Sequence, residues 1–107
     1  MKEGAYEVQI KEEHKITDYE AIPLLFHEKK SAIIKVLMEK ELNLKELSEE
    51  LKLNPGTVHR HLKDLLRFEL ITETHEEKKY GQKMIYYRAN ATRQYLVSVN
   101  FKWPDEE

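Results

Sequence analysis

The spacing of the hydrophobic residues changes near residue 70, and this change most restricts the fold of the chain. Before it, residues 28–40, 45–52 and 55–69 carry apolar side chains at the three- and four-residue spacing of amphipathic helices. After it, residues 70–76 and 83–89 are rich in Ile, Thr and Tyr and flank a polar stretch that contains Gly81. Such a pair of runs is typical of a β-hairpin. The pattern therefore predicts three helices followed by a hairpin.

A short turn joins the second and third of these helices. Residues 53–57 read Leu-Asn-Pro-Gly-Thr, and Asn is a favoured N-cap while Pro is a favoured first helical residue. The third helix is therefore predicted to begin at Pro55 and to end near Glu69. The second helix, residues 45–52, is predicted to follow a short extended link at residues 42–44. Two amphipathic helices joined by a tight turn predict a helix-turn-helix over residues 45–69.

The segment before the first long helix contains a capping signal and a proline. Residues 17–20 read Thr-Asp-Tyr-Glu, which fits a capping box with Thr17 as the N-cap and Glu20 three residues later. Pro23 interrupts the helix that follows, so this helix either ends early or begins near Ile22.

Both ends of the chain alternate between apolar and polar residues. This period of two predicts half-buried strands over residues 5–11 and 95–103. Strands at a sheet edge tend to acquire partners, so we expect the two strands to take part in dimerisation. The alternative is that they pair with each other within one chain.

These patterns together predict a single domain of the α+β class. A length of 107 residues suits one domain with one modest core. The predicted fold is mainly α with a β-hairpin wing. It is a winged helix-turn-helix with the wing at residues 70–89 and additional N- and C-terminal strands.

The face of the third helix opposite its buried stripe predicts a DNA-binding surface. A helix that enters the major groove needs small or polar groups near its N-terminus. Arginine can bond a guanine edge, and lysine suits phosphates. The alternative is an ordinary solvated helix face. The residues predicted to contact DNA from this helix are Gly56, Thr57, His59, Arg60, Lys63 and Arg67.

The tip of the hairpin adds a second set of basic residues. Lys78, Lys79 and Lys83 surround Gly81 and suit contacts with the DNA backbone or minor groove. The alternative is a hairpin tip that is charged only for solubility, because Glu76 and Glu77 dilute the patch.

The histidines show no spacing that predicts a metal site. His61 falls near the buried side of the third helix and is expected to be packed and hydrogen-bonded. His59 is the better candidate for a DNA contact. No metal and no other cofactor is expected.

Composition excludes several classes of function. The chain has no cysteine, no phosphate-binding Gly-rich loop and no paired-carboxylate motif, so we expect no enzyme. No apolar run approaches the roughly 18 residues of a membrane span, and a cytoplasmic location is expected. The formal net charge is −2, which argues against tight non-specific binding of nucleic acid. That charge divides unevenly, with −3 over residues 1–54, +2 over residues 55–88 and −1 over residues 89–107.

From Thr17 to about Val97 the chain resembles ArsR-type (arsenic-repressor-like) winged-helix regulators, especially archaeal and bacterial ones. The similarity lies in residues 41–70, ELNLKELSEELKLNPGTVHRHLKDLLRFEL, in residues 57–63 as the core of the recognition helix, and in residues 86–89, Tyr-Tyr-Arg-Ala. The resemblance implies a homodimer that represses transcription.

Two departures from the family pattern stand out. Asn43 and Lys45 stand where metal-sensing members carry paired cysteines, so thiolate metal sensing is excluded. Lys52 stands where the family often ends the scaffold helix with Gly, which implies left-handed backbone or a shifted cap.

The sequence thus predicts a regulator that binds double-stranded DNA specifically, acts as a homodimer and represses transcription. The alternative is a winged-helix adaptor for protein–protein contacts in the transcription machinery. A small-molecule effector is a further, open possibility. An abundance of Glu and Lys, 17 and 14 residues, favours a thermophilic source.

Overall fold

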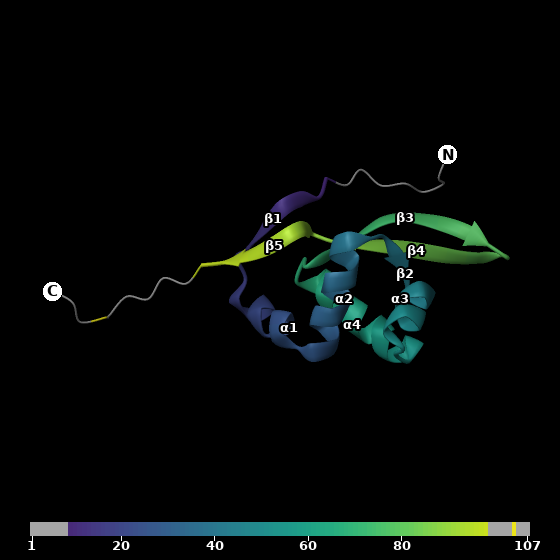
Figure 1. The fold of residues 1–107 in the computed structure, drawn as a ribbon, viewed down its shortest axis with the longest axis horizontal. Helices are drawn as coiled ribbons and strands as arrows, with labels where there is room; N and C mark the ends of the chain where they lie inside the picture. The colour runs from purple at the N-terminus through teal and green to yellow at the C-terminus, as the bar shows by residue number, and fades with distance from the viewer. Residues whose placement is uncertain (1–8, 99–103, 105–107) are drawn as a thin grey trace.

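The computed structural model describes residues 9–98 and residue 104. It has a helical layer below a band of strands (Figure 1). The elements, in chain order, are β1 (Lys11–Ile16), a 3₁₀ turn (Tyr19–Ala21), α1 (Ile22–Phe26), α2 (Glu28–Glu39), β2 (Leu42–Asn43), α3 (Leu44–Leu51), α4 (Pro55–Arg67), β3 (Ile71–Lys79), β4 (Gln82–Ala89) and β5 (Ala91–Val97). The predicted class, a winged helix-turn-helix with additional strands, is confirmed.

The core lies where α2, α3 and α4 meet one another and the start of the wing. Each helix contributes the apolar stripe that its sequence spacing predicted, and removing these side chains from water drives the packing. The largest fully buried side chains are Ile33, Leu37, Leu47, Val58, Leu62, Leu65, Leu70 and Ile71.

The helix-turn-helix begins with a reciprocal cap. The side chain of Asn43 accepts a hydrogen bond from the backbone N–H of Glu46 at 2.8 Å, and the Glu46 carboxylate accepts one from the N–H of Asn43 at 3.0 Å. This capping box places the start of α3 at Leu44, one residue before the predicted start. The helix ends at Leu51, and Lys52 follows in the left-handed conformation, with φ 55° and ψ 46°. The implied left-handed residue at this position is confirmed.

The predicted N-cap at Thr17 is wrong. Asp18 caps the 3₁₀ turn instead, because its side-chain oxygen accepts a hydrogen bond from the backbone N–H of Glu20 at 2.9 Å. The turn passes into α1 at Ile22, and Pro23 lies in its first turn. A proline is tolerated there because the N–H it lacks has no helical partner at that position.

The wing lies within the predicted residues 70–89, but its strands extend further towards the tip than predicted, which leaves a two-residue tip. Its strands reach Lys79 and restart at Gln82, so only Tyr80 and Gly81 lie between them. Both have positive φ, 53° and 76°, as a tight hairpin turn of the I′ type requires. β4 lies between β2 and β3 in an antiparallel sheet. A bulge between Glu73 and His75 turns the His75 side chain into the interior, where it is buried.

The terminal strands pair with each other in parallel, at positions that differ from those predicted. β1 begins at Lys11, and residues 9 and 10 are not in a strand. The predicted strand 5–11 therefore reaches β1 only at Lys11, and its residues 5–8 lie outside the described part. β5 begins at Ala91, four residues before the predicted strand 95–103, whose residues 99–103 also lie outside that part. The pairing of β1 with β5 sets the bounds of both strands. The sequence of residues 11–16 could not, since it does not alternate between apolar and polar residues.

No helix in the described part of the chain is long and apolar enough to cross a membrane.

Candidate nucleic-acid interface

Helix α4 has one buried face and one polar face, as its sequence spacing predicts. Val58, Leu62 and Leu65 are buried against the core. Thr57 is half-buried at the margin between the faces. The other predicted contact residues of this helix are exposed: Gly56, His59, Arg60, Lys63 and Arg67.

The first turn of α4 is held by its own cap. The side-chain oxygen of Asn54 accepts a hydrogen bond from the backbone N–H of Gly56 at 2.8 Å, and Pro55 follows the cap directly. A Cβ added to Gly56 would lie 3.1 Å from that capping oxygen. A larger residue at this position would therefore crowd the cap, and the small one also gives a ligand close access to the helix end.

The charge on the exposed face of α4 is mainly positive. Its one acidic residue, Asp64, is paired with Lys30 of α2, whose Nζ lies 3.4 Å from Oδ2 of Asp64. Within residues 9–98, neither Arg60 nor Lys63 has an ion pair. The two cations are thus free to bind an external anion, and the helix N-terminus adds partial positive charge.

Arg67 lies apart from this group. It is the last residue of α4, and its guanidinium carbon lies 5.5 Å from the centre of the Phe68 ring. It borders a hollow shared with Lys15 and Asp18 next to β1. At 1.5 Å per residue, it is about 16 Å along the helix axis from Gly56. The structure does not bring Arg67 together with the residues at the start of the helix.

The three wing lysines are exposed, but their surroundings differ. Lys78 pairs directly opposite Lys83 across the hairpin, an arrangement of like charges that destabilises a sheet. Lys83 is partly neutralised by Glu76, because its Nζ lies 3.0 Å from Oε2 of Glu76. Lys78 and Lys79 have no ion pair among the described residues, so these two carry the free positive charge of the wing.

Tyr80 is a candidate that the sequence analysis missed. It is fully exposed at the wing tip, between Lys79 and Gly81. An aromatic residue with positive φ is uncommon, and small residues normally occupy this turn position. The signal available in the sequence was the aromatic residue inside an otherwise polar hairpin tip.

The groove between the wing tip and α3 suits a phosphate poorly. It has a volume of about 610 Å³ and is lined by Lys45 and Lys79, but also by the carboxylates of Glu46 and Glu49. The face of α4 that carries Arg60 and Lys63 is therefore the better anion site.

His61 is packed, as expected, but not hydrogen-bonded. Both of its ring nitrogens are buried and lack a hydrogen-bond partner among the described residues. Its ring centre lies 5.1 Å from that of His27, which caps α2 through its Nδ1. Burial, followed by the charge of Lys30, lowers the pKa of His61. His61 therefore belongs to the packing between α2 and α4 rather than to the polar face.

His75 joins the base of the wing to the scaffold. Its Nε2 lies 2.9 Å from Oε2 of Glu77, and its Nδ1 lies 3.1 Å from Oε2 of Glu41. Its ring stacks on Tyr86 with centroids 4.3 Å apart. In the part of the chain that the structure describes, no three His, Asp or Glu side chains are grouped so that they could hold a metal ion.

Comparison with known proteins identifies chains with the fold described above and a family model for its helix-turn-helix. The family model "Bacterial regulatory protein, arsR family" matches residues 27–73, which span α2, the helix-turn-helix and the start of β3. A search of curated proteins found no significant match.

Among solved structures, HlyU from Vibrio cholerae N16961 is 25% identical with a TM-score of 0.54, over 66% of this chain and 72% of that one. The reduced form of that HlyU is 27% identical with a TM-score of 0.55, over 66% and 70% of the two chains. The transcriptional regulator HlyU from Vibrio vulnificus CMCP6 is 26% identical with a TM-score of 0.53, over 64% and 66%.

Proposed function

We propose that this chain, whose helix-turn-helix is of the ArsR type, is a transcription regulator that binds double-stranded DNA in a sequence-specific manner. The observation that carries the proposal is the polar face of α4. Arg60 and Lys63 are exposed and unpaired within the described residues, while Asp64 is neutralised by Lys30. The similarity to HlyU, described for Vibrio vulnificus as a transcriptional regulator, supports the same assignment.

In the proposed complex, the N-terminal half of α4 enters the major groove. Arg60 reads a guanine edge with its planar guanidinium, whereas Lys63 contacts a phosphate. Thr57 and His59 lie on either side of this pair around the helix circumference and complete the contact surface. Gly56 and the capped helix end approach a phosphate through the backbone.

The wing contacts the flanking DNA backbone. Lys78 and Lys79 supply the charge, and Lys83 contributes less because Glu76 already holds it. Tyr80 at the tip is fully exposed and so accessible to the DNA. Arg67 plays a secondary role, because its position at the far end of α4 suits only a distant phosphate.

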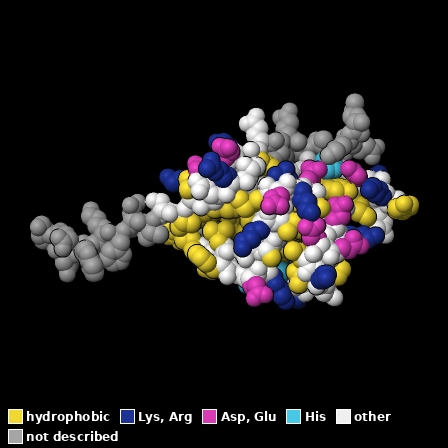
Figure 2. All heavy atoms as spheres, in the orientation of Figure 1, with side chains coloured by type: hydrophobic (Ala, Val, Ile, Leu, Met, Phe, Trp, Pro, Cys, Tyr) yellow, Lys and Arg dark blue, Asp and Glu magenta, His cyan; other side chains and the backbone are white. Residues whose placement is uncertain are grey.

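The regulator acts as a homodimer in this proposal. Exposed apolar side chains occur near the terminal strands, where Leu96 and Val97 are 41% and 43% exposed and Phe26 of α1 is 82% exposed. Figure 2 shows hydrophobic side chains gathered where β5 lies beside α1. A dimer places two α4 helices in successive major grooves, which requires half-sites about one helical turn or a multiple of it apart.

Further parts of the proposal concern the cellular role. The protein represses transcription in the cytoplasm, as the resemblance to ArsR-type regulators implies. Its abundance of Glu and Lys points to a thermophilic, archaeal source, and a melting temperature above that of mesophilic domains is expected.

Footprinting on the upstream region of its own gene, followed by mobility-shift titrations across a salt series, tests the proposal. A protected pseudo-palindrome is expected, together with an affinity that falls linearly in log salt concentration. Random DNA should bind only weakly, because the net positive charge is only +2 and lies within residues 55–88. A chain that gives no shift resistant to competitor DNA is instead an adaptor that binds another protein.

A further inference from the structure

The strand β1 has an unpaired edge. It pairs with β5 in a two-stranded parallel sheet, and no other described strand lies beside it. Parallel strands are normally found inside larger sheets, and two strands alone are only marginally stable. The edge of β1 that faces away from β5 presents backbone N–H and C=O groups that can template a further strand.

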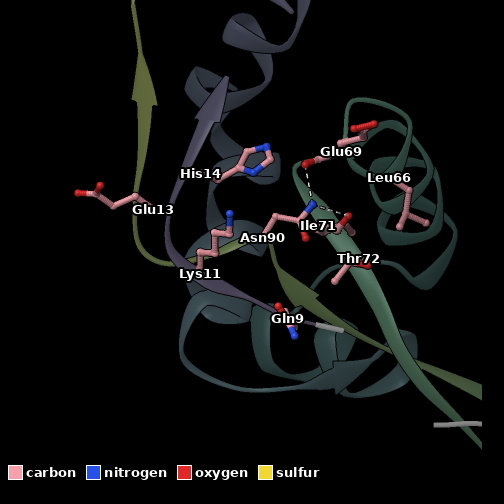
Figure 3. Close-up of a pocket in the computed structure, with 9 residues that line it drawn as sticks. All are labelled: Gln9, Lys11, Glu13, His14, Leu66, Glu69, Ile71, Thr72 and Asn90. Atoms are coloured by element: carbon pink, nitrogen blue, oxygen red, sulfur yellow. Dashed lines mark hydrogen bonds between the residues drawn. The ribbon is translucent and has the colours of Figure 1, made fainter. Parts of the chain in front are cut away.

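The two faces of this sheet are distinct. His14 pairs beside Tyr95, with which it makes an edge-to-face ring contact, and Ile16 is buried. In Figure 3 the His14 side chain points towards Asn90 and the hollow at the end of α4, whereas Glu13 points away from it. Glu13 and Lys15 therefore lie on the outer face, and His14 and Ile16 lie on the inner face.

We propose that β1 of one copy pairs antiparallel with β1 of a second copy across a two-fold axis. The resulting sheet has the strand order β5-β1-β1-β5. This inference rests on the homodimer of the proposed function and specifies its contact. A two-fold axis perpendicular to the sheet keeps the inner faces on one side, so the helical layers of both copies lie on that side.

The register of β1 against β1 of the second copy follows from the two faces of the strand and from the charges on its outer face. Residues opposite each other must share a face, because a slip of one residue exchanges the two faces of a strand. With His14 opposite its own copy, Glu13 lies opposite Lys15 of the second copy, and this opposite-charge pair occurs twice. A shift of the crossing point to Glu13 would oppose Glu13 to itself and Lys11 to Lys15. A shift to Lys15 would oppose Lys15 to itself. Of these three registers, only the one centred on His14 places unlike charges opposite each other on the outer face.

Glu13 and Lys15, the charged residues on the outer face of β1, are available for the contact. Lys15 is exposed and has no ion pair among the described residues. Glu13 is exposed, and its carboxylate accepts a hydrogen bond from the side chain of Gln94 on the neighbouring strand. That bond holds Glu13 on the outer face without neutralising its charge. The strand thus carries a self-complementary pattern on the side that a second copy would meet.

Cysteine cross-linking tests the register, because the natural chain has no cysteine. The full-length variants Glu13→Cys and Lys15→Cys are mixed in equal amounts and oxidised, and disulfide dimers are measured on a non-reducing gel. The mixture is expected to give at least several-fold more dimer than either variant alone, because only the mixed pair places the two thiols opposite each other. Lys35→Cys on α2, mixed with Glu13→Cys, is the matched control and is expected to remain uncross-linked.

Charge exchange supplies an independent readout by sedimentation. Glu13→Lys is expected to raise the dimer Kd several-fold, since it opposes two lysines twice. The double variant with Glu13→Lys and Lys15→Glu is expected to restore dimerisation. If the double variant dimerises again, loss of the hydrogen bond between Glu13 and Gln94 cannot explain the weaker dimer of Glu13→Lys, because the double variant also lacks Glu13.

The outcomes separate this inference from the proposed function. A dimeric mass with no enrichment of the mixed cross-link, or no rescue by charge exchange, overturns the β1 pairing but leaves the DNA-binding homodimer in place. A monomeric mass at micromolar concentration overturns both the pairing and the homodimer, whereas DNA binding is judged separately by the footprint.

Discussion

The guanidinium of Arg88 donates hydrogen bonds to the end of α2, with Nε 2.9 Å from the carbonyl oxygen of Leu37. Its Nη2 lies 2.9 Å from the carbonyl oxygen of Met38. The last carbonyls of a helix lack partners within the helix and carry partial negative charge. Arg88 satisfies two of them from strand β4, so one side chain ties the wing to the helical layer.

Replacing Arg88 should therefore destabilise the fold. Arg88→Ala is expected to lower the free energy of unfolding by about 1.5–3 kcal/mol, the range for hydrogen bonds that involve a charged group. Arg88→Lys should recover part of the loss, because it keeps the charge but not the two-pronged geometry. Urea unfolding measures both. Arg93→Ala, at an exposed position of β5, is the control and should change stability by less than about 0.5 kcal/mol. Equal stability of Arg88→Ala and the natural chain would show that this link is unimportant.

The buried, unpartnered imidazole of His61 predicts loss of stability in mild acid. Burial and the nearby Lys30 lower the pKa of His61 from its ordinary value of 6.5. The unfolded chain therefore binds a proton near pH 6.5, while the folded chain resists it. The stability linked to this group is fully present above pH 6.5 and declines as the pH falls below that value.

Unfolding titrations at pH 7.5 and pH 5.5 measure this effect. The natural chain should lose more stability between the two conditions than His61→Gln, whose side chain does not titrate. His59→Gln is the matched control, because His59 is exposed on the same helix, and it should retain the full pH dependence. Identical pH dependence in His61→Gln and the natural chain would refute the assignment.

The left-handed residue that ends α3 predicts a stabilising substitution. Lys52 has φ 55° and ψ 46°, a conformation that favours glycine because a Cβ crowds the following carbonyl. Lys52→Gly should raise the free energy of unfolding by about 0.5–1 kcal/mol, since relief of the Cβ contact is partly offset by the greater freedom of the unfolded chain. Glu49→Gly, inside the same helix, should lower it by about 1 kcal/mol. A loss of stability in Lys52→Gly would mean that contacts of the lysine outweigh its backbone conformation.

The wing predicts a sequence-independent contribution to DNA binding. Lys79→Ala should weaken binding to all DNA sequences similarly and reduce the slope of log affinity against log salt by about one phosphate contact. Lys35→Ala, an exposed lysine on α2, removes the same charge away from the proposed interface and should leave the slope unchanged. Loss of discrimination between operator and random DNA in Lys79→Ala would instead place Lys79 on a base.

Features set by neighbouring residues in the chain could be predicted from the sequence. The helix-turn-helix is the clearest case, because Asn54 and Pro55 start α4 and the spacing of Val58 and Leu62 fixes its buried face. The position of Arg60 on the polar face follows from the same spacing. These features depend on the helical period and on capping, both of which are local.

Features that depend on distant partners could not be predicted. β1 forms because its backbone pairs with β5, about 80 residues later in the chain, and not because its own residues alternate. The same holds for Arg88, whose partners lie on α2. The bulge that buries His75 likewise follows from the register of β3 against β4.

The most direct test of the account compares Arg60→Ala with the natural chain on the footprinted operator and on random DNA of the same length. Arg93→Ala is the control for loss of one arginine. Arg60→Ala should bind the operator about 5- to 150-fold more weakly, the effect of losing one two-pronged base contact of about 1–3 kcal/mol. Its affinity for random DNA should change far less, so that sequence preference relaxes. Unchanged operator affinity and unchanged preference in Arg60→Ala would contradict the central claim that α4 reads the DNA sequence.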